Sequence, residues 1–117
     1  MEQQVRFGVF ELDPTSGELR KSGIRVPLSG QPLEVLTLLV RRSGDVVARE
    51  ELKEALWQDE TFVDFDNGIN SAIRRIRRAL DDSPSSPRFL ETLPKRGYRF
   101  IAPVRGSRPE EARETER

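Results

Sequence analysis

Four arginines fall within five consecutive positions of a segment whose isoleucines recur at helical spacing. They are Arg74, Arg75, Arg77 and Arg78. A guanidinium group stays charged and can donate two parallel hydrogen bonds to a phosphate or to the O6 and N7 edge of guanine. The chain has 20 basic and 20 acidic residues, so its net charge is zero and only the location of charge is informative. Positive charge gathered on one surface predicts binding of a polyanion.

This segment is predicted to form a helix over residues 67–80, with Asp66 as its N-cap. Projected at 100° per residue, four apolar residues fall within about a 60° arc and predict the buried stripe, namely Ile69, Ile73, Ile76 and Leu80. The rest of the helix supplies the candidate nucleic-acid contacts, which are Asn67, Asn70, Ser71, Arg74, Arg75, Arg77 and Arg78. The alternative is an ordinary solvated basic face, in which Arg77 pairs with Asp81 and Arg78 with Asp82.

A second group of cations lies in a β-hairpin predicted from residues 89–93 and 98–102. The turn between these strands carries Lys95 and Arg96, and Arg99 follows in the second strand. Gly97 is expected to supply the positive φ that the turn requires. Such a basic ribbon can reach a minor groove or phosphates, although surface hairpins often carry lysine and arginine for solvation alone.

The elements before these two are predicted from turn residues and apolar periodicity. The first 28 residues form an antiparallel sheet of about three strands, with residues 5–12 as one strand and Ser22-Gly23 as a hairpin turn. Ser29 caps a helix over residues 31–43, and Gly44 ends it in a left-handed conformation.

Two further segments complete the expected α+β arrangement of a sheet, three helices and a hairpin. A second helix covers residues 49–57, and residues 58–65 form a loop packed down by Phe62 and Phe65. Residues 81–87 contain two prolines and three serines, so they end the third helix.

Composition weighs against catalysis. The chain has neither cysteine nor histidine, so it lacks a thiolate nucleophile and the commonest metal ligand and general base. We therefore expect no enzymatic activity, no metal and no cofactor. No apolar run approaches the roughly 20 residues that span a bilayer, and the first residues do not form a signal peptide. We expect a cytoplasmic domain without membrane contact of its own.

Charge is unevenly distributed along the chain, which leaves a second function open. Residues 45–66 hold eight acidic and two basic residues, whereas residues 67–99 hold eight basic and three acidic ones. The basic part favours a nucleic acid as partner. The acidic part, residues 45–66, is the alternative working face of a protein-interaction module.

Three sequence stretches together resemble the winged helix-turn-helix of the OmpR/PhoB type, a family of bacterial transcription regulators. They are Val46-Val47-Ala48-Arg49-Glu50-Glu51-Leu52 leading to Leu56-Trp57, the stretch from Ile69 to Leu80, and Gly97-Tyr98-Arg99-Phe100. The resemblance covers residues 5–104. It implies a recognition helix in the major groove of double-stranded DNA and a wing at the minor groove or phosphates.

By position in this resemblance, Asn70 and Arg75 match residues that read bases. Arg74 and Arg77 match cations near the DNA backbone, and Arg99 matches the wing arginine. Three departures from the family pattern are Ala48 in place of a capping serine or threonine, Ala72 in place of a larger polar contact, and Pro94-Lys95-Arg96 in the wing turn. We therefore expect a weak start to the second helix and one contact fewer on the third.

The resemblance also sets expectations for organisation and partners. We expect a DNA-binding domain over residues 1–104 and a disordered linker or tail over residues 105–117. The position of this domain at the start of the chain resembles that in one-component regulators, in which the sensor follows the DNA-binding domain. The full-length protein could therefore be membrane-anchored through a later region. Expected partners are double-stranded DNA, bound as tandem copies or a dimer, and RNA polymerase, contacted through the loop before the third helix.

Overall fold

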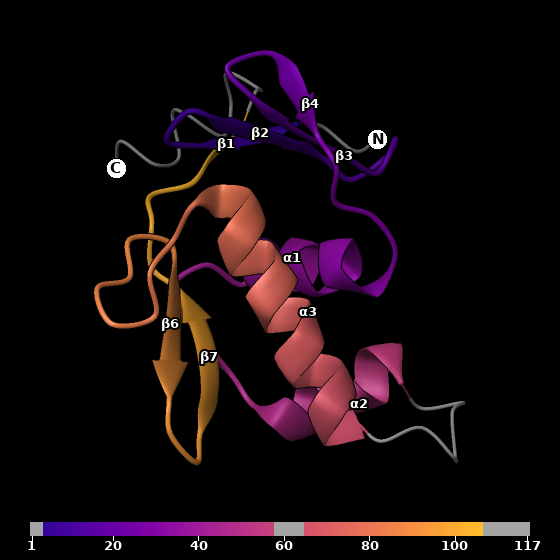
Figure 1. Cartoon of the computed structure of the whole chain (residues 1–117), viewed down its shortest axis with the longest axis vertical. Helices are drawn as coiled ribbons and strands as arrows, with labels where there is room; N and C mark the ends of the chain where they lie inside the picture. Colours follow the sequence, from indigo (N-terminus) through magenta and orange to yellow (C-terminus); the bar gives the residue numbers. More distant parts are fainter. Residues whose placement is uncertain (1–3, 58–64, 107–117) are drawn as a thin grey trace.

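A computed structural model describes residues 4–57 and 65–106 of the chain. In chain order the elements are β1 Val5–Phe7, β2 Phe10–Asp13, β3 Glu18–Lys21, β4 Ile24–Val26, α1 Gln31–Arg41, β5 Val46–Val47, α2 Arg49–Leu56, α3 Phe65–Leu80, β6 Leu90–Leu93, β7 Gly97–Phe100 and β8 Arg105–Gly106. An N-terminal sheet lies at one end, α3 crosses in front of α1, and the hairpin of β6 and β7 runs beside α3 (Figure 1). The predicted class, a winged helix-turn-helix, is confirmed.

The N-terminal sheet has the strand order β4-β3-β2-β1-β8. The single strand predicted over residues 5–12 is wrong, because Gly8 adopts φ +61° and the chain turns between Phe7 and Phe10, which pair with each other. The predicted Ser22-Gly23 turn is confirmed, with positive φ at both residues. Arg105 and Gly106, which the sequence assigned to the tail, form β8, which pairs with β1 at the edge of this sheet.

The wing sheet has the order β5-β7-β6, and the sequence did not predict β5. Val46 and Val47 pair with Arg99 and Tyr98, so the segment between α1 and α2 forms an edge of the wing. Two residues are too few to show the alternation of a strand, so β5 can be identified only by its pairing with β7. The predicted loop at residues 58–64, with Phe62, and the predicted tail beyond residue 106 lie outside the described residues.

The helices begin and end close to their predicted positions, with different caps. The N-cap of α1 is Gly30 instead of Ser29, and the helix ends at Arg41, two residues before the predicted end. Gly44 has the expected positive φ, but its N–H donates to the carbonyl of Phe100 in the wing. Helix α3 begins at Phe65, so Asp66 lies in its first turn and is not its cap.

The start of α2 follows Ala48, whose side chain has no hydrogen-bond acceptor. Its N–H instead donates to the Glu51 carboxylate at 2.9 Å, which provides one half of a capping box. Arg42 donates to the other oxygen of Glu51. The Ala48 N–H and the Arg42 guanidinium together hold the pKa of Glu51 below its ordinary value. The predicted weakness of this cap is therefore partly compensated by Glu51.

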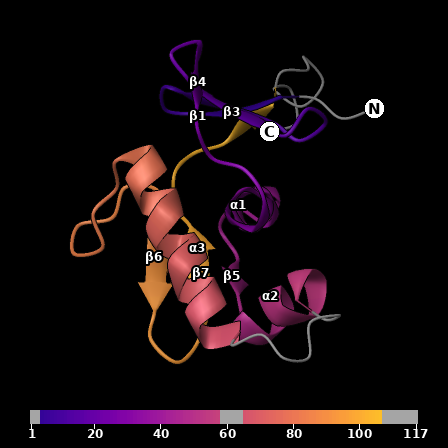
Figure 2. The same ribbon diagram turned by 45° about the vertical axis from the view of Figure 1, so that its right-hand side comes forward.

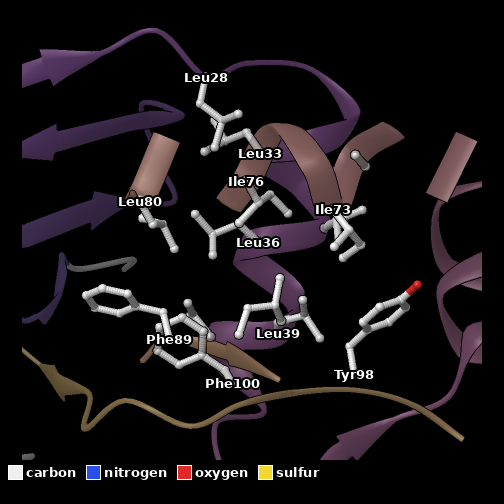
Figure 3. Close-up of a cluster of buried hydrophobic side chains, with 14 of the residues drawn as sticks. Leu28, Leu33, Leu36, Leu39, Ile73, Ile76, Leu80, Phe89, Tyr98 and Phe100 are labelled. Carbon is white, nitrogen blue, oxygen red and sulfur yellow. The ribbon is translucent and has the colours of Figure 1, made fainter. Parts of the chain in front are cut away.

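The core extends from the inner face of the N-terminal sheet to α2. Its central part lies between α1, α3 and the inner face of the wing (Figure 3). The predicted stripe of α3 is buried: Ile69, Ile73, Ile76 and Leu80 are at most 4% exposed. Ala72 is buried as well, at 2%, so the reading of this position as a lost outward contact is wrong. Core packing fixes which side of α3 faces solvent.

Asp82 stabilises the connection between α3 and the wing, a role that the sequence did not reveal. The residue is 9% exposed, and its carboxylate accepts three backbone N–H groups, from Arg88 at 2.7 Å, Phe89 at 3.2 Å and Leu90 at 2.9 Å. The pair predicted between Arg78 and Asp82 is not formed in this part of the structure. Asp82 instead fixes where β6 begins.

We expect Asp82→Asn to lower the free energy of unfolding by about 2 kcal/mol, because the amide nitrogen cannot accept the N–H groups that one carboxylate oxygen now receives. Urea unfolding at neutral pH measures the change. Asp81→Asn is the matched control, since it removes the same charge at an exposed neighbour. Equal losses in both variants would contradict this role for Asp82.

Candidate nucleic-acid interface

The solvent-facing side of α3 is rich in cations that nothing within the described chain neutralises. Arg74, Arg75 and Arg78 are exposed, and none forms a hydrogen bond or ion pair with another described residue. Asn67 and Asn70 are exposed on the same helix, and Ser71 is half-buried. Because α1 covers the opposite side, these residues are held outward by the core.

Arg75 and Arg78 also form one wall of a surface groove. The opposite wall is residues 26–29, the connection from β4 to α1, and the groove has a volume of about 440 Å³. Ala79 contributes to it from the flank of α3 that faces away from the wing. Two guanidinium groups therefore border a concave surface wide enough for a phosphate group.

The wing lies along the other flank of α3, as two views 45° apart show (Figures 1 and 2). Lys95 and Arg96 at its turn are exposed, and within the described residues neither side chain has a polar partner. Lys95 adopts φ +66°, and Gly97 adopts φ +145°, as the turn prediction required of the glycine. The turn thus presents two cations beside the basic helix.

Arg99 is placed differently from the other cations of the wing. It lies opposite Glu91 in the register of β6 and β7, and its Nε and Nη2 donate to one Glu91 oxygen at 2.9 and 2.6 Å. Both side chains are about one-third exposed, at 36% and 34%. Tyr98 and Phe100 are buried, so Arg99 stands on the outer face of the wing sheet. A DNA contact by Arg99 would compete with this carboxylate.

Arg77 faces the wing, away from the outward arginines. Its Nη2 donates to the Leu90 carbonyl at 3.1 Å and to the Thr92 hydroxyl at 2.7 Å. Its Nε is buried without a hydrogen-bond partner in the described structure. The alternative pairing with Asp81 is not formed. The sequence grouped Arg77 with the other arginines of the helix, because the strand that it meets could not be predicted from helical spacing.

Arg49 is a residue of the site that sequence reasoning missed. From the first position of α2, its Nη1 donates to the Tyr98 hydroxyl at 2.7 Å and its Nη2 to Asp66 at 2.9 Å. Its guanidinium also lies 5.7 Å from the centroid of the Phe65 ring. Arg49 thereby connects α2, the first turn of α3 and the wing. Its proximity to α3 depends on chain folding, so spacing gave no signal.

The seven cations among the predicted contact residues thus divide into two groups. Five cations face solvent around α3 and the wing turn, namely Arg74, Arg75, Arg78, Lys95 and Arg96. Arg77 and Arg99 are engaged within the domain. Over residues 4–57 and 65–106, acidic side chains do not gather in a group of three that could hold a metal ion, and the helices there are too short or too polar to cross a membrane.

Known sequences and structures resemble this chain over most of its length. Residues 23–100 match the sequence profile of the family described as "Transcriptional regulatory protein, C terminal". The cholera toxin transcriptional activator of Vibrio cholerae serotype O1 is 36% identical over 110 residues, which is 92% of this chain and 37% of that protein. The chain therefore spans just over one-third of the length of this relative.

Solved structures share the fold. Response regulator DrrB of Thermotoga maritima, described as an OmpR/PhoB homologue, superposes with a TM-score of 0.74 and 33% identity, covering 85% of this chain and 44% of that one. The RstA DNA-binding domain of Klebsiella pneumoniae, solved in complex with the RstA box, superposes with a TM-score of 0.72 and 26% identity, covering 84% and 96% of the two chains.

Proposed function

The chain belongs to the OmpR/PhoB-type family of transcriptional regulatory C-terminal domains, and from this premise we propose that it binds specific sequences of double-stranded DNA. One observation carries the proposal. Arg74, Arg75 and Arg78 face solvent on α3, with no ion pair to any described residue. Basic groups left without intramolecular partners are available to phosphates and base edges.

In this proposal α3 enters the major groove and the wing turn lies over the backbone or the minor groove. Arg75 and Asn70 read base edges, because arginine recognises guanine and asparagine recognises adenine through paired hydrogen bonds. Asn67 and Ser71 add shorter polar contacts. Arg74, Arg78, Lys95 and Arg96 bind phosphates, and Arg78 does so at the groove beside residues 26–29.

Useful affinity requires more than one copy of the domain. A single module of this kind buries on the order of 600–1,000 Å² of protein surface on DNA. Two copies on neighbouring half-sites therefore bind the operator, as tandem repeats or as a dimer. RNA polymerase is the proposed protein partner, reached through residues 58–64.

The alternative protein-interaction face, residues 45–66, is less free than its composition suggested. Glu51 is paired with Arg42, and Asp66 is paired with Arg49. Glu50 and Glu54 remain exposed. The unpaired side chains in the described part of this face therefore carry a smaller net charge than those on the basic side of α3.

Selection of bound duplexes from a random pool, followed by titration of the selected site at several salt concentrations, tests the proposal. We expect the logarithm of the association constant to fall linearly with the logarithm of salt concentration, by roughly 0.9 for each phosphate contacted. Enriched sites should contain repeated half-sites at a fixed spacing. Salt-independent binding, or no enrichment, would favour the protein-interaction alternative.

A further inference from the structure

The distance between the wing and α3 must stay fixed if both are to contact the same duplex. Strand β6 is an edge strand that receives sheet hydrogen bonds only from β7, and α3 contacts it through Arg77, which donates to the Leu90 carbonyl. Beyond core packing, two arginines connect the wing to α3 within residues 4–57 and 65–106. They are Arg77 and Arg49, and each contact involves a hydroxyl group of the wing.

The first connection lies towards the C-terminal end of α3. Arg77 donates from one nitrogen to the Leu90 carbonyl and the Thr92 hydroxyl, two acceptors on the same strand. Its buried, unpaired Nε shows that the stem is enclosed between helix and strand at some energetic cost. A side chain free to reach a DNA phosphate would keep this atom solvated.

The second connection lies at the N-terminal end of α3. Arg49 donates to Asp66 in the first turn of α3 and to the Tyr98 hydroxyl on β7. Its Nη1 and Nη2 are therefore used inside the domain, and its face lies over the Phe65 ring. Arg77 and Arg49 thus connect α3 to the wing near opposite ends of the helix.

We infer that Arg77 and Arg49 are positioning residues that hold the wing in register with α3, so that wing and helix engage DNA as one rigid unit. The inference rests on the proposed function. Rigid placement lowers the entropy lost on binding, and hence makes the contacts of Lys95 and Arg96 effective. Arg77 is thereby reassigned from a backbone contact to a support of the wing.

Thr92→Val and Tyr98→Phe each remove one hydroxyl and keep the shape of the side chain. Both variants would be combined with Arg96→Ala, which reports on the wing, and with Arg75→Ala, which reports on α3. Dissociation constants for a selected duplex then give double-mutant cycles. Thr37→Val is the matched control, because the Thr37 hydroxyl donates to Leu33 within α1.

We expect Arg96→Ala to weaken binding about fivefold in the parent and less than about twofold with Thr92→Val or Tyr98→Phe present. The effect of Arg75→Ala should remain the same in all backgrounds. The inference would be overturned if Arg96→Ala weakened binding by the same factor in all backgrounds. It would also be overturned if Thr92→Val left the dissociation constant unchanged while Arg77→Ala reduced the salt slope by roughly 0.9, since Arg77 would then contact a phosphate itself. A parent that binds no duplex would instead refute the proposed function.

Discussion

Replacing Arg74, Arg75 and Arg78 together by alanine is expected to weaken duplex binding at least about 100-fold. An arginine bonded to guanine contributes about 1 to 3 kcal/mol of discrimination, and each lost phosphate contact reduces the salt slope by roughly 0.9. All three side chains are exposed, so the fold should tolerate their removal. Titration of the selected duplex at two or more salt concentrations measures both effects.

Stability should move in the opposite direction to affinity. Arg74 and Arg78 lie four positions apart on one helix, where like charges repel by roughly 0.2 to 0.5 kcal/mol. The triple variant should therefore unfold at an equal or slightly higher temperature than the parent. This separates loss of a binding surface from loss of structure.

A second triple variant controls for net charge. Arg6, Arg20 and Lys21 lie in the N-terminal sheet, and their replacement by alanine also removes three positive charges. If binding depends on the basic side of α3, this variant should retain most of its affinity. Equal losses in both triple variants would show that the attraction is general and would contradict a dedicated interface.

Gly97→Ala is expected to lower the free energy of unfolding by roughly 3 to 5 kcal/mol, the largest stability effect of a single substitution considered for this chain. A Cβ atom at this position would lie 2.1 Å from the Val47 carbonyl oxygen and 2.8 Å from its carbon. These are backbone atoms of β5, paired with the neighbouring Tyr98, so they cannot move without opening the wing sheet. The φ of +145° adds conformational strain.

Gly23→Ala separates the steric effect from the conformational one. Gly23 also has a positive φ, +85°, but a Cβ there meets nothing within 4 Å. Its replacement should cost about 1 kcal/mol, from backbone conformation alone. Urea unfolding midpoints of both variants, compared at equal slope, measure the difference. A Gly97→Ala variant no less stable than Gly23→Ala would contradict the close contact between residue 97 and the Val47 backbone.

Local patterns predicted the long elements well. The four apolar residues of α3 recur over about three helical turns, and all four are buried, because a helix packed on one core needs a single apolar stripe. The Ser22-Gly23 turn was equally predictable, since a two-residue hairpin loop requires positive φ and glycine adopts it without steric cost. The resemblance to a known family added the order of elements and the identity of the wing.

Short strands that depend on a distant partner could not be predicted from the sequence. Strand β5 has two residues and β8 has two, so neither can display a period. Both exist because a distant strand offers hydrogen bonds, β7 to β5 and β1 to β8. The turn at Gly8 was missed for a related reason, because alternating apolar residues continue through it and favour one strand over two.

By itself, the sequence determined that cations would cover the outer side of one helix and the turn of one hairpin. This follows from local periodicity and turn chemistry, which act over a few residues. Only the tertiary structure decided which of those cations are free. Arg74 and Arg77 are alike in the sequence, but Arg77 meets the hydroxyl of Thr92, fifteen positions away, and Arg74 meets solvent. Hydrogen bonds depend on distances of about 3 Å, and those distances are set by how the helix and the wing pack together.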